Sequence, residues 1–390
     1  MNTRTLRGSC AIAGVATFGC GETPGFTDLE LLAHAAHAAV VDAGLQMTDI
    51  DGLCTASVSS PMWAMPVIEY LGLNPRYIDG TMLGGSSFIA HLLPAIQALE
   101  AGRCRHVLVC YGSAQRSGTF GRSASAGARR LLDPQPYEHP YEPMLPPSAY
   151  ALAASRHMYE FGTTRAQMAD VAVAARAWAR LNPEAFVRDP LTRDDVLRSR
   201  MVSDPLSVRD CCLVTDGAGA FVLTRADRAR DLPNRPVYVL GNSTAVWNRQ
   251  ISSMHDLTVT AAQQSGADTF AMAGFTPRDI DVVQLYDAFT INTILFLEDL
   301  GFCAKGEGGA FVSDGRIAPG GALPVNTNGG GLSCVHPGMY GIFALIEAVR
   351  QLRGEAGERQ VPGALTALAH GNGGTLSSQS TAILATADAL

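Results

Sequence analysis

One stretch of the chain occurs twice, and this repeat constrains the fold more than any other feature. Residues 43–51 read AGLQMTDID and residues 273–281 read AGFTPRDID, so five of the nine positions are identical. Each copy joins the end of a helix-like segment to a short apolar run. A match between segments in the same surroundings indicates internal duplication. The sequence therefore predicts two similar halves, each built from alternating strands and helices.

The expected elements follow from the spacing of apolar residues. A helix over 28–43 has Thr27 or Asp28 as its N-cap. We expect strands at 10–18, 50–56, 106–112, 237–240, 281–286, 364–369 and about 380–386, and further helices at 86–101, 258–273, 289–301 and 338–353. This alternation predicts an α/β fold whose sheet is covered on both faces.

The middle of the chain breaks the pattern. Residues 114–210 contain an arginine-bearing stretch from Ser117 to Arg130 and a helical, amphipathic block from Ser148 to Arg180. Prolines cluster between the two, at 134, 136, 140, 143, 146 and 147. We expect an insertion here, either a lid or a dimerisation element, because long irregular segments in compact proteins are often functional. The halves are then 1–113 with 211–235, and 236–390.

Composition excludes several classes of protein. Hydrophobic residues make up 47% of the 390 residues, which is enough for a large core and excludes a disordered chain. The net charge of −7 argues against binding to nucleic acid. We expect no secretory signal and no membrane span, because no apolar run is long enough. The nine cysteines are scattered without C-x-x-C spacing, which predicts reduced thiols, a cytoplasmic location and no metal site.

Four motifs occur in a fixed order along the chain. They are VTDGAGA at 214–220, LYDAF at 285–289, NGGGLSCVHP at 328–337 and HGNGG at 370–374. In order and spacing they resemble the D-G-A-x-A, N-E-A-F, G-G-x-x-x-G-H-P and C-x-G-G motifs of the thiolase superfamily, in its sterol-carrier or lipid-transfer branch. The resemblance implies duplicated βαβαβαββ halves in a five-layered α-β-α-β-α arrangement, with an inserted loop and helical region.

The departures from the thiolase pattern carry the functional argument. The thiolase nucleophile is a cysteine at a helix start, where the helix N-terminus favours the thiolate. That position falls at about Gly85, within MLGGSSF, where the chain has no cysteine. His370 or Gly371 replaces the second thiolase cysteine, and Tyr286 replaces the N-E-A-F asparagine. His336 is what remains of the catalytic set, so Claisen exchange through an acyl-cysteine has little support.

The chain is closer to the thiolase-like aldolases of steroid side-chain degradation, in which tyrosines at such positions do the acid/base work. The resemblance implies retro-aldol cleavage of a bulky, steroid-like or aromatic β-hydroxyacyl-CoA to a ketone or aldehyde plus a short acyl-CoA. It assigns Tyr286 and Tyr340 as acid and base, in either order, and places His336 in the oxyanion site. We expect the pocket to include Gly85, Ser86, Asp287, Asn372 and Gly373, with backbone N–H groups near Gly85–Ser86 or Gly373–Gly374 as donors.

Other interpretations stay open. A thiolase-type acyltransferase would use Cys334 or Ser86 as nucleophile, and a catalytically inactive scaffold subunit would use neither. Ser86 fits a simple helix cap as well, and Tyr286, Tyr340 and His336 each fit a purely structural role. The glycines at 329–331 lack the spacing of a nucleotide-binding loop.

The resemblance also implies partners. It predicts no bound cofactor, with the CoA thioester acting as substrate. It predicts a homodimer that pairs with a small OB-fold protein bearing a zinc ribbon, giving a heterotetramer. Arg116, Arg122, Arg129 and Arg130 are candidates for contacts to the CoA phosphates, and solvated surface charge is the alternative.

Overall fold

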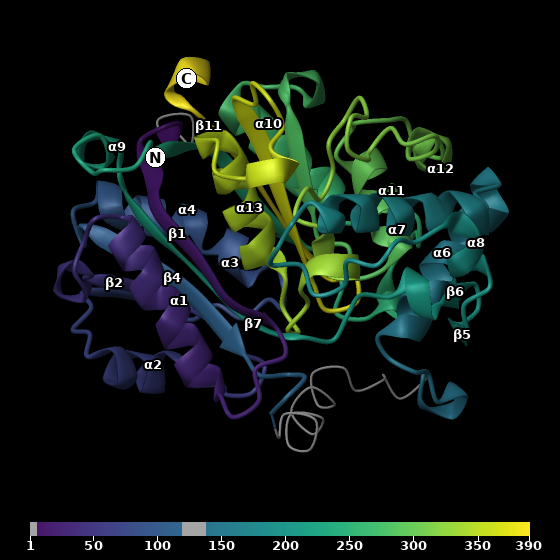
Figure 1. Cartoon of the computed structure of the whole chain (residues 1–390), viewed down its shortest axis with the longest axis horizontal. Coiled ribbons are helices and arrows are strands. Elements are labelled where there is room, and N and C mark those ends of the chain that lie inside the picture. The colour runs from purple at the N-terminus through teal and green to yellow at the C-terminus, as the bar shows by residue number, and fades with distance from the viewer. Residues whose placement is uncertain (1–5, 119–137) are drawn as a thin grey trace.

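A mixed nine-stranded sheet forms the centre of the molecule. The computed structural model describes residues 6–118 and 138–390 (Figure 1). The strand order is β3-β2-β4-β7-β1-β8-β11-β10-β9. The strands are β1 (Cys10–Gly21), β2 (Gly52–Thr55), β3 (Tyr77–Asp79), β4 (His106–Ser113), β7 (Asp216–Arg225), β8 (Val237–Val246), β9 (Val282–Leu285), β10 (Thr366–Gly373) and β11 (Ser378–Ala385).

The two halves meet at the middle of this sheet. The first half supplies the strands from β3 to β1, and the second half supplies those from β8 to β9. Strand β1 pairs antiparallel with β8 through Ala11–Tyr238 and Ile12–Val237, so hydrogen bonds join the halves directly. This confirms the thiolase-like α/β fold expected from the motifs.

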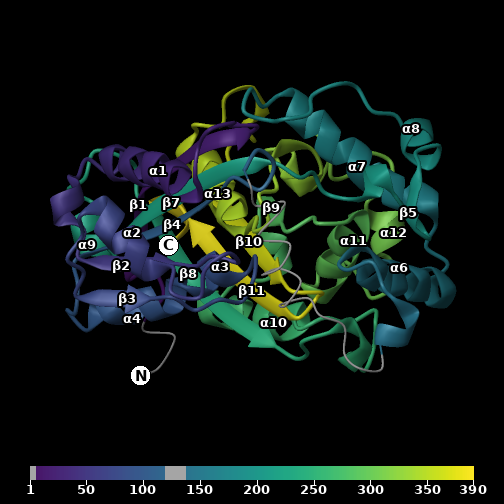
Figure 2. The same ribbon diagram turned by 90° about the horizontal axis from the view of Figure 1, so that it is seen from below.

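The two halves of the sheet alternate with three groups of helices, which gives five layers (Figures 1 and 2). Helices α1 (Asp28–Asp42) and α2 (Ala64–Leu71) pack outside the first half, and α10 (Ala262–Ala273) packs outside the second. Helices α3 (Ser87–Ala90), α4 (Leu92–Glu100) and α13 (Gly341–Arg353) lie between the halves, and α13 contacts strands of both. Strand β4 illustrates how one strand packs against helices on both of its faces. Leu108 packs with the buried side chains of α1, and its neighbour Val107 packs with those between the halves, because successive strand side chains face opposite sides.

The duplicated segment has the same local structure in both copies. Gly44 and Gly274 follow the ends of α1 and α10 with φ of +70° and +71°. This left-handed conformation is one that glycine adopts without strain. A short 3-10 turn follows in each copy, at Met47–Asp49 and Pro277–Asp279, and leads into β2 or β9.

The predicted helix at 86–101 is broken in the structure. It forms as α3 and α4, which meet at His91. Pro94 explains the break, because it lacks the N–H that would bond to the carbonyl of Ala90 in a continuous helix. The predicted cap of α1 is correct at Thr27, whose side chain accepts from the Glu30 N–H in a capping box.

The middle segment, residues 114–210, forms helices that pack against the second half, residues 236–390. These are α6 (Pro147–Phe161), α7 (Arg165–Arg180) and α8 (Arg193–Leu197), with a small hairpin of β5 (Met201–Ser203) and β6 (Leu206–Ser207). The predicted block at 148–180 is therefore divided at Gly162 (φ +71°). Helices α6 and α7 pack on α11 (Thr290–Asp299), at the right of Figure 1. Within residues 6–118 and 138–390, the remaining helices are α9 (Ala226–Ala229) and α12 (Gly308–Phe311).

Residues 119–137, which include the candidate arginines at 122, 129 and 130 and the prolines at 134 and 136, lie outside the described residues. Arg116 is described, and its Nε lies 3.2 Å from a Glu22 carboxylate oxygen. Across residues 6–118 and 138–390, no helix is both long enough and apolar enough to cross a bilayer.

Candidate active site

A cavity of about 1310 Å³ opens where the two halves meet the middle segment. Its size exceeds the range of about 300–1,000 Å³ typical of small-molecule sites. Its walls come from segments far apart in the sequence. They are residues 82–85, 143–147, 211–214, 246–249, 288–289, 338–339, 372–374 and 377–378, with Val58, Gln115, Tyr150, Val202, Val208, Tyr286 and His336.

Tyr286 and His336 form a hydrogen-bonded pair on the cavity wall. Tyr286 follows the end of β9, and its Oη lies 3.1 Å from Nε2 of His336. The His336 loop is fixed from the other side, because the Thr215 hydroxyl accepts from the His336 backbone N–H at 2.9 Å. The Gly338 carbonyl is a weaker partner of the Tyr286 hydroxyl, at 3.3 Å. The structure therefore brings together two of the three side chains that the sequence assigns to catalysis.

The backbone at Gly85 lies directly against the Tyr286 ring. A Cβ placed at Gly85 would lie 2.0 Å from Cε2 and 2.6 Å from Oη of Tyr286, closer than atoms can approach. Any side chain at this position would overlap the phenol. The tyrosine thus occupies the space that a nucleophile at position 85 would need, which gives a physical reason for glycine there.

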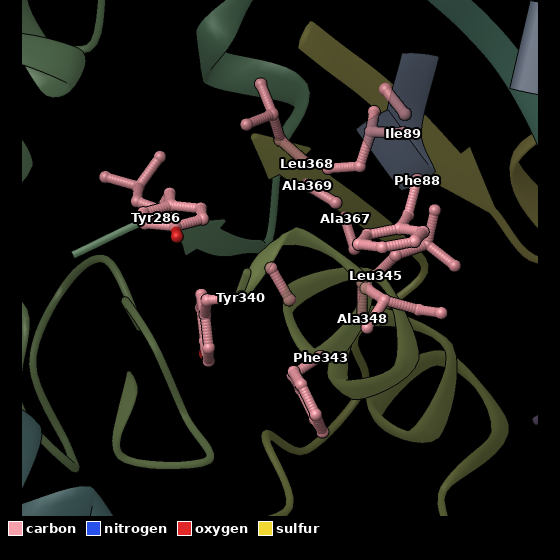
Figure 3. Close-up of a cluster of buried hydrophobic side chains, with 14 of the residues drawn as sticks. Phe88, Ile89, Tyr286, Tyr340, Phe343, Leu345, Ala348, Ala367, Leu368 and Ala369 are labelled. Carbon is pink, nitrogen blue, oxygen red and sulfur yellow. The ribbon is translucent and has the colours of Figure 1, made fainter. Parts of the chain in front are cut away.

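Tyr340 lies next to Tyr286 but outside the cavity. The two rings pack edge to face, with centroids 5.6 Å apart (Figure 3). Tyr340 is fully buried, and its hydroxyl donates to Oδ1 of Asn328 at 2.9 Å. Tyr286 lines the cavity and Tyr340 does not. The structure therefore does not place both candidate acid–base tyrosines on the cavity wall.

Asp287 also points away from the cavity. Its carboxylate accepts from the backbone N–H of Gly331 at 2.6 Å and from that of Leu332 at 3.4 Å. These residues belong to the π-helical turn η7 (Gly330–Cys334), so Asp287 anchors the glycine-rich loop instead of lining the pocket. Burial raises the pKa of Asp287 to about 7, even though these backbone donors favour the charged form.

Burial sets the charge of the Tyr286–His336 pair. It raises the pKa of Tyr286 well above its usual value, and the nearby Cys212 thiol adds to the shift. It lowers the pKa of His336 to about 4. Both side chains are therefore neutral near pH 7, and they are joined by a hydrogen bond between neutral groups and not by an ion pair.

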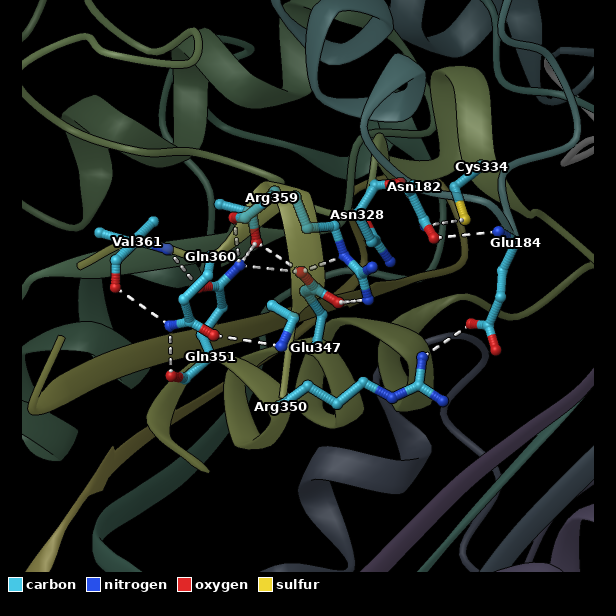
Figure 4. Close-up of polar contacts among 12 residues, drawn as sticks. Asn182, Glu184, Asn328, Cys334, Glu347, Arg350, Gln351, Arg359, Gln360 and Val361 are labelled. Carbon is cyan, nitrogen blue, oxygen red and sulfur yellow. Dashed lines mark hydrogen bonds and ion pairs between the residues drawn. The ribbon is translucent and has the colours of Figure 1, made fainter. Parts of the chain in front are cut away.

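The other candidate nucleophiles lie elsewhere. Ser86 is fully buried, and its Oγ bonds to the Leu83 carbonyl at 2.9 Å and to Ser378 Oγ at 2.7 Å. Cys334 contacts Asn182 Nδ2 at 3.5 Å on the far side of the loop (Figure 4). Neither lines the cavity. Cys211 and Cys212 are among the residues that line the cavity, and no sequence pattern singled them out.

Asn372 and Gly373 line the cavity as expected, and a chain of hydrogen bonds holds Asn372 in place. Its Nδ2 donates to Tyr150 Oη at 2.9 Å, and its Oδ1 accepts from Gln379 Nε2 at 2.8 Å. Gln379 in turn contacts Nε2 of His370 at 3.0 Å. His370 is thus a buried support of the wall. Tyr150, which stacks on Phe289 at 4.3 Å, is a cavity residue that helical spacing alone could not distinguish from core.

A second buried network supports the loop that carries Asn328 (Figure 4). Arg359 and Glu347 form a bidentate ion pair, with both N···O distances at 3.0 Å. The Thr327 hydroxyl donates to the same carboxylate at 2.7 Å. Glu347 of α13, paired with Arg359 beyond the end of that helix, thus holds Thr327, the residue before Asn328.

The arrangement suits proton transfer at a bulky substrate. Within the described ranges, no group of three or more histidine, cysteine, aspartate or glutamate side chains is arranged to hold a metal ion. The cavity instead offers a phenol–imidazole pair, backbone amides near Gly85 and Gly373, and largely apolar walls.

Known proteins resemble the chain over nearly its full length. Residues 243–386 match the family model described as thiolase C-terminal domain-like. An acetyl-CoA acetyltransferase of Methanothermobacter thermautotrophicus is 35% identical, over 94% of this chain and 96% of the relative. A 17-hydroxy-3-oxo-4-pregnene-20-carboxyl-CoA lyase of Mycobacterium tuberculosis is 33% identical, over 90% and 92%. Among solved structures, the Ltp2-ChsH2(DUF35) aldolase superposes with a TM-score of 0.88 at 31% identity, over 98% of each chain.

These similarities agree with the fold and with the order of the four motifs. The relatives include both acetyltransferases and carbon–carbon lyases, so family membership alone does not choose between the two reactions. The chain belongs to the thiolase superfamily, in its sterol-carrier-protein-2-thiolase-like branch.

Proposed function

We propose that the protein cleaves a bulky β-hydroxyacyl-CoA by a retro-aldol reaction, releasing a ketone or aldehyde and a short acyl-CoA. One observation carries the proposal: the Tyr286 phenol, bonded to His336 at 3.1 Å, fills the space beside Gly85 and faces the cavity. A site that has a phenol at the nucleophile position is equipped to move protons and not to form an acyl-enzyme.

Tyr286 and His336 together accept the β-hydroxyl proton. Nε2 of His336 lies 3.1 Å from the Tyr286 hydroxyl, and it can accept from that hydroxyl when the ring carries its proton on Nδ1. As Tyr286 Oη takes the substrate proton, it passes its own proton to Nε2. The histidine thus supplies the partner that a tyrosine base needs, since its ordinary pKa of about 10 makes it a poor base alone.

Bond cleavage then places negative charge on the thioester oxygen of the leaving enolate. Backbone N–H groups stabilise such charge well in a cavity that excludes water. The segments Gly84–Gly85 and Gly373–Gly374 line the wall near Tyr286 and can approach a thioester closely because they have no side chains. We assign the oxyanion donors to these segments, with Asn372 beside them.

The cavity suits a large, rigid acyl group. Its apolar lining includes Met144, Val202, Val246 and Trp247. A volume of about 1310 Å³ accommodates a polycyclic acyl group together with the end of the CoA arm. The similarity to a pregnene-carboxyl-CoA lyase supports a steroid-like substrate.

An acyltransferase is the competing function, supported by the acetyltransferase among the relatives. It would require an acyl adduct on a nucleophile, and neither Ser86 nor Cys334 faces the cavity. An inactive scaffold subunit is the other alternative, and it predicts no turnover at all.

The similar Ltp2-ChsH2(DUF35) aldolase combines two proteins, of which ChsH2 is of the DUF35 type. We propose that this protein likewise works as a homodimer with a small partner of that kind, carrying an OB fold and a zinc ribbon. Assays should therefore use the chain both alone and co-purified with such a partner.

The test compares two hydroxyl deletions. Tyr286→Phe removes the cavity-facing hydroxyl, and we expect kcat for release of ketone from a steroid β-hydroxyacyl-CoA to fall by about 10²–10⁴-fold. Tyr340→Phe removes the neighbouring buried hydroxyl, and we expect a loss of about 1 kcal/mol in stability with kcat changed only a few-fold. Equal activity of wild type and Tyr286→Phe would refute the mechanism. An acyl adduct found by mass spectrometry would favour acyl transfer, and no turnover with any partner would favour a scaffold.

A further inference from the structure

Retro-aldol cleavage needs a second proton transfer, to the carbon of the enolate. The Tyr286–His336 pair has by then received a proton from the β-hydroxyl, and Tyr340 does not reach the cavity. The enolate carbon lies one atom beyond the carbon that bore the hydroxyl. An acid other than this pair would have to face the same cavity, a few ångströms from Tyr286.

Cys212 occupies such a position. The segment from Cys211 runs antiparallel to the segment after β9, with a bridge between Cys211 and Phe289. The Cys212 N–H donates to the Ala288 carbonyl at 2.8 Å. This backbone contact holds Cys212 beside the segment that follows Tyr286, and Cys212, Ala288 and Tyr286 all line the cavity.

The electrostatics agree with this proximity. After burial, Cys212 is the largest contributor to the raised pKa of Tyr286, so the two groups lie within electrostatic reach of each other. Burial also raises the pKa of the Cys212 thiol, with Cys211 and Asp287 adding to the shift. The thiol is therefore protonated at neutral pH and is a proton donor, not a nucleophile. The adjacent Cys211 is a poorer candidate for the proton donor, because its thiol already donates to the Ser207 carbonyl at 3.3 Å.

We propose that Cys212 is the acid that protonates the enolate carbon, an inference that rests on the proposed retro-aldol reaction. The S–H proton forms the new C–H bond of the short acyl-CoA and leaves a thiolate. The imidazolium then returns its proton to Tyr286 while the phenol proton passes to the thiolate, so the cycle has no net proton and no change of oxidation state. The transfer to carbon is favourable because a thioester enolate is a far stronger base than a thiolate.

The reverse of this step can be measured without cleavage, because the Tyr286–His336 pair can take the thiol proton and leave the thiolate that removes the α-proton. The wild-type protein, with its partner, is incubated with acetyl-CoA or propanoyl-CoA in D₂O, and α-deuteration is followed by mass spectrometry. We expect Cys212→Ala and the closer-sized Cys212→Ser to lose exchange by about 10²-fold or more. Cys303→Ala removes another partly buried thiol, outside the cavity lining, and should exchange like wild type.

The same variants are then assayed for cleavage. Loss of the acid should lower kcat by about 10²-fold while KM changes little, since the group acts on the transition state. Exchange in Cys212→Ala at the wild-type rate, or no exchange in the wild type, would overturn the assignment. A protein that exchanges through Cys212 but cleaves no β-hydroxyacyl-CoA would instead refute the proposed function and leave the acid in place.

Discussion

Adding one methyl group at Gly85 tests the reasoning most directly. In Gly85→Ala the new Cβ would lie 2.0 Å from Cε2 and 2.6 Å from Oη of Tyr286. Carbon atoms in contact sit about 3.5–4.0 Å apart, so the ring must move by more than about 1 Å. The ring has little room to move, because Tyr286 is 4% exposed and packs against Tyr340. Overpacking of this kind costs about 1–3 kcal/mol.

The same shift breaks the proposed catalytic pair of Tyr286 and His336. The Tyr286–His336 distance of 3.1 Å leaves little margin before a hydrogen bond is lost. A misplacement of about 1 Å at a reacting group can lower the rate by about 10²-fold. We therefore expect Gly85→Ala to lose both stability and activity, although alanine favours the helix that starts at Ser87.

Thermal denaturation and cleavage assays measure the two effects separately. Gly80→Ala is the matched control, since its Cβ would meet nothing closer than the Thr55 carbonyl at 3.9 Å. Pairing Gly85→Ala with Tyr286→Ala should recover part of the lost stability, with a coupling energy of about 0.5–3 kcal/mol. A stable, active Gly85→Ala protein would show that the phenol does not occupy this space.

Two further predictions concern buried groups behind the cavity. His370 is fully buried with a pKa lowered to about 3, so only the unfolded state takes up a proton as pH falls below about 6.5. Stability should therefore fall by about 2 kcal/mol from this group between pH 7 and pH 5, and chemical denaturation should show a shallower loss in His370→Gln. Arg359→Leu leaves the Glu347 carboxylate buried and unpaired, and should cost about 3–5 kcal/mol. The double change Arg359→Leu with Glu347→Leu should cost clearly less stability in the same measurement. An equal cost would show that the arginine stabilises the fold by something other than this ion pair.

Local patterns predicted the parts of the fold that depend on local physics. The repeat at residues 43–51 and 273–281 forms two equivalent helix–turn–strand units, and Thr27 caps α1 as expected. The single helix over 86–101 was wrong because apolar spacing continues through Pro94 although the backbone hydrogen bonding cannot. Motif order identified the family, because glycines and a histidine at fixed separations reflect close backbone approaches that few folds require.

The site was harder to predict, since the direction of a side chain depends on distant segments. Tyr286 and Tyr340 are equivalent in sequence terms, yet Asn328 draws the hydroxyl of Tyr340 away from the cavity. Asp287 adjoins Tyr286 in sequence, but alternation turns its carboxylate toward Gly331. Cys212 and Tyr150 reach the cavity through pairings with Ala288 and Asn372, which lie 76 and 222 residues away along the chain.

These contacts explain why loss of the nucleophile and gain of the phenol belong together. A residue larger than glycine at 85 excludes the observed position of Tyr286, and a smaller residue at 286 would leave His336 without its partner at 3.1 Å. Either change alone leaves a site that is strained or incomplete, so the two positions constrain each other. The glycine is thus as much a part of the proposed lyase chemistry as the tyrosine, and the coupling between Gly85→Ala and Tyr286→Ala measures that dependence.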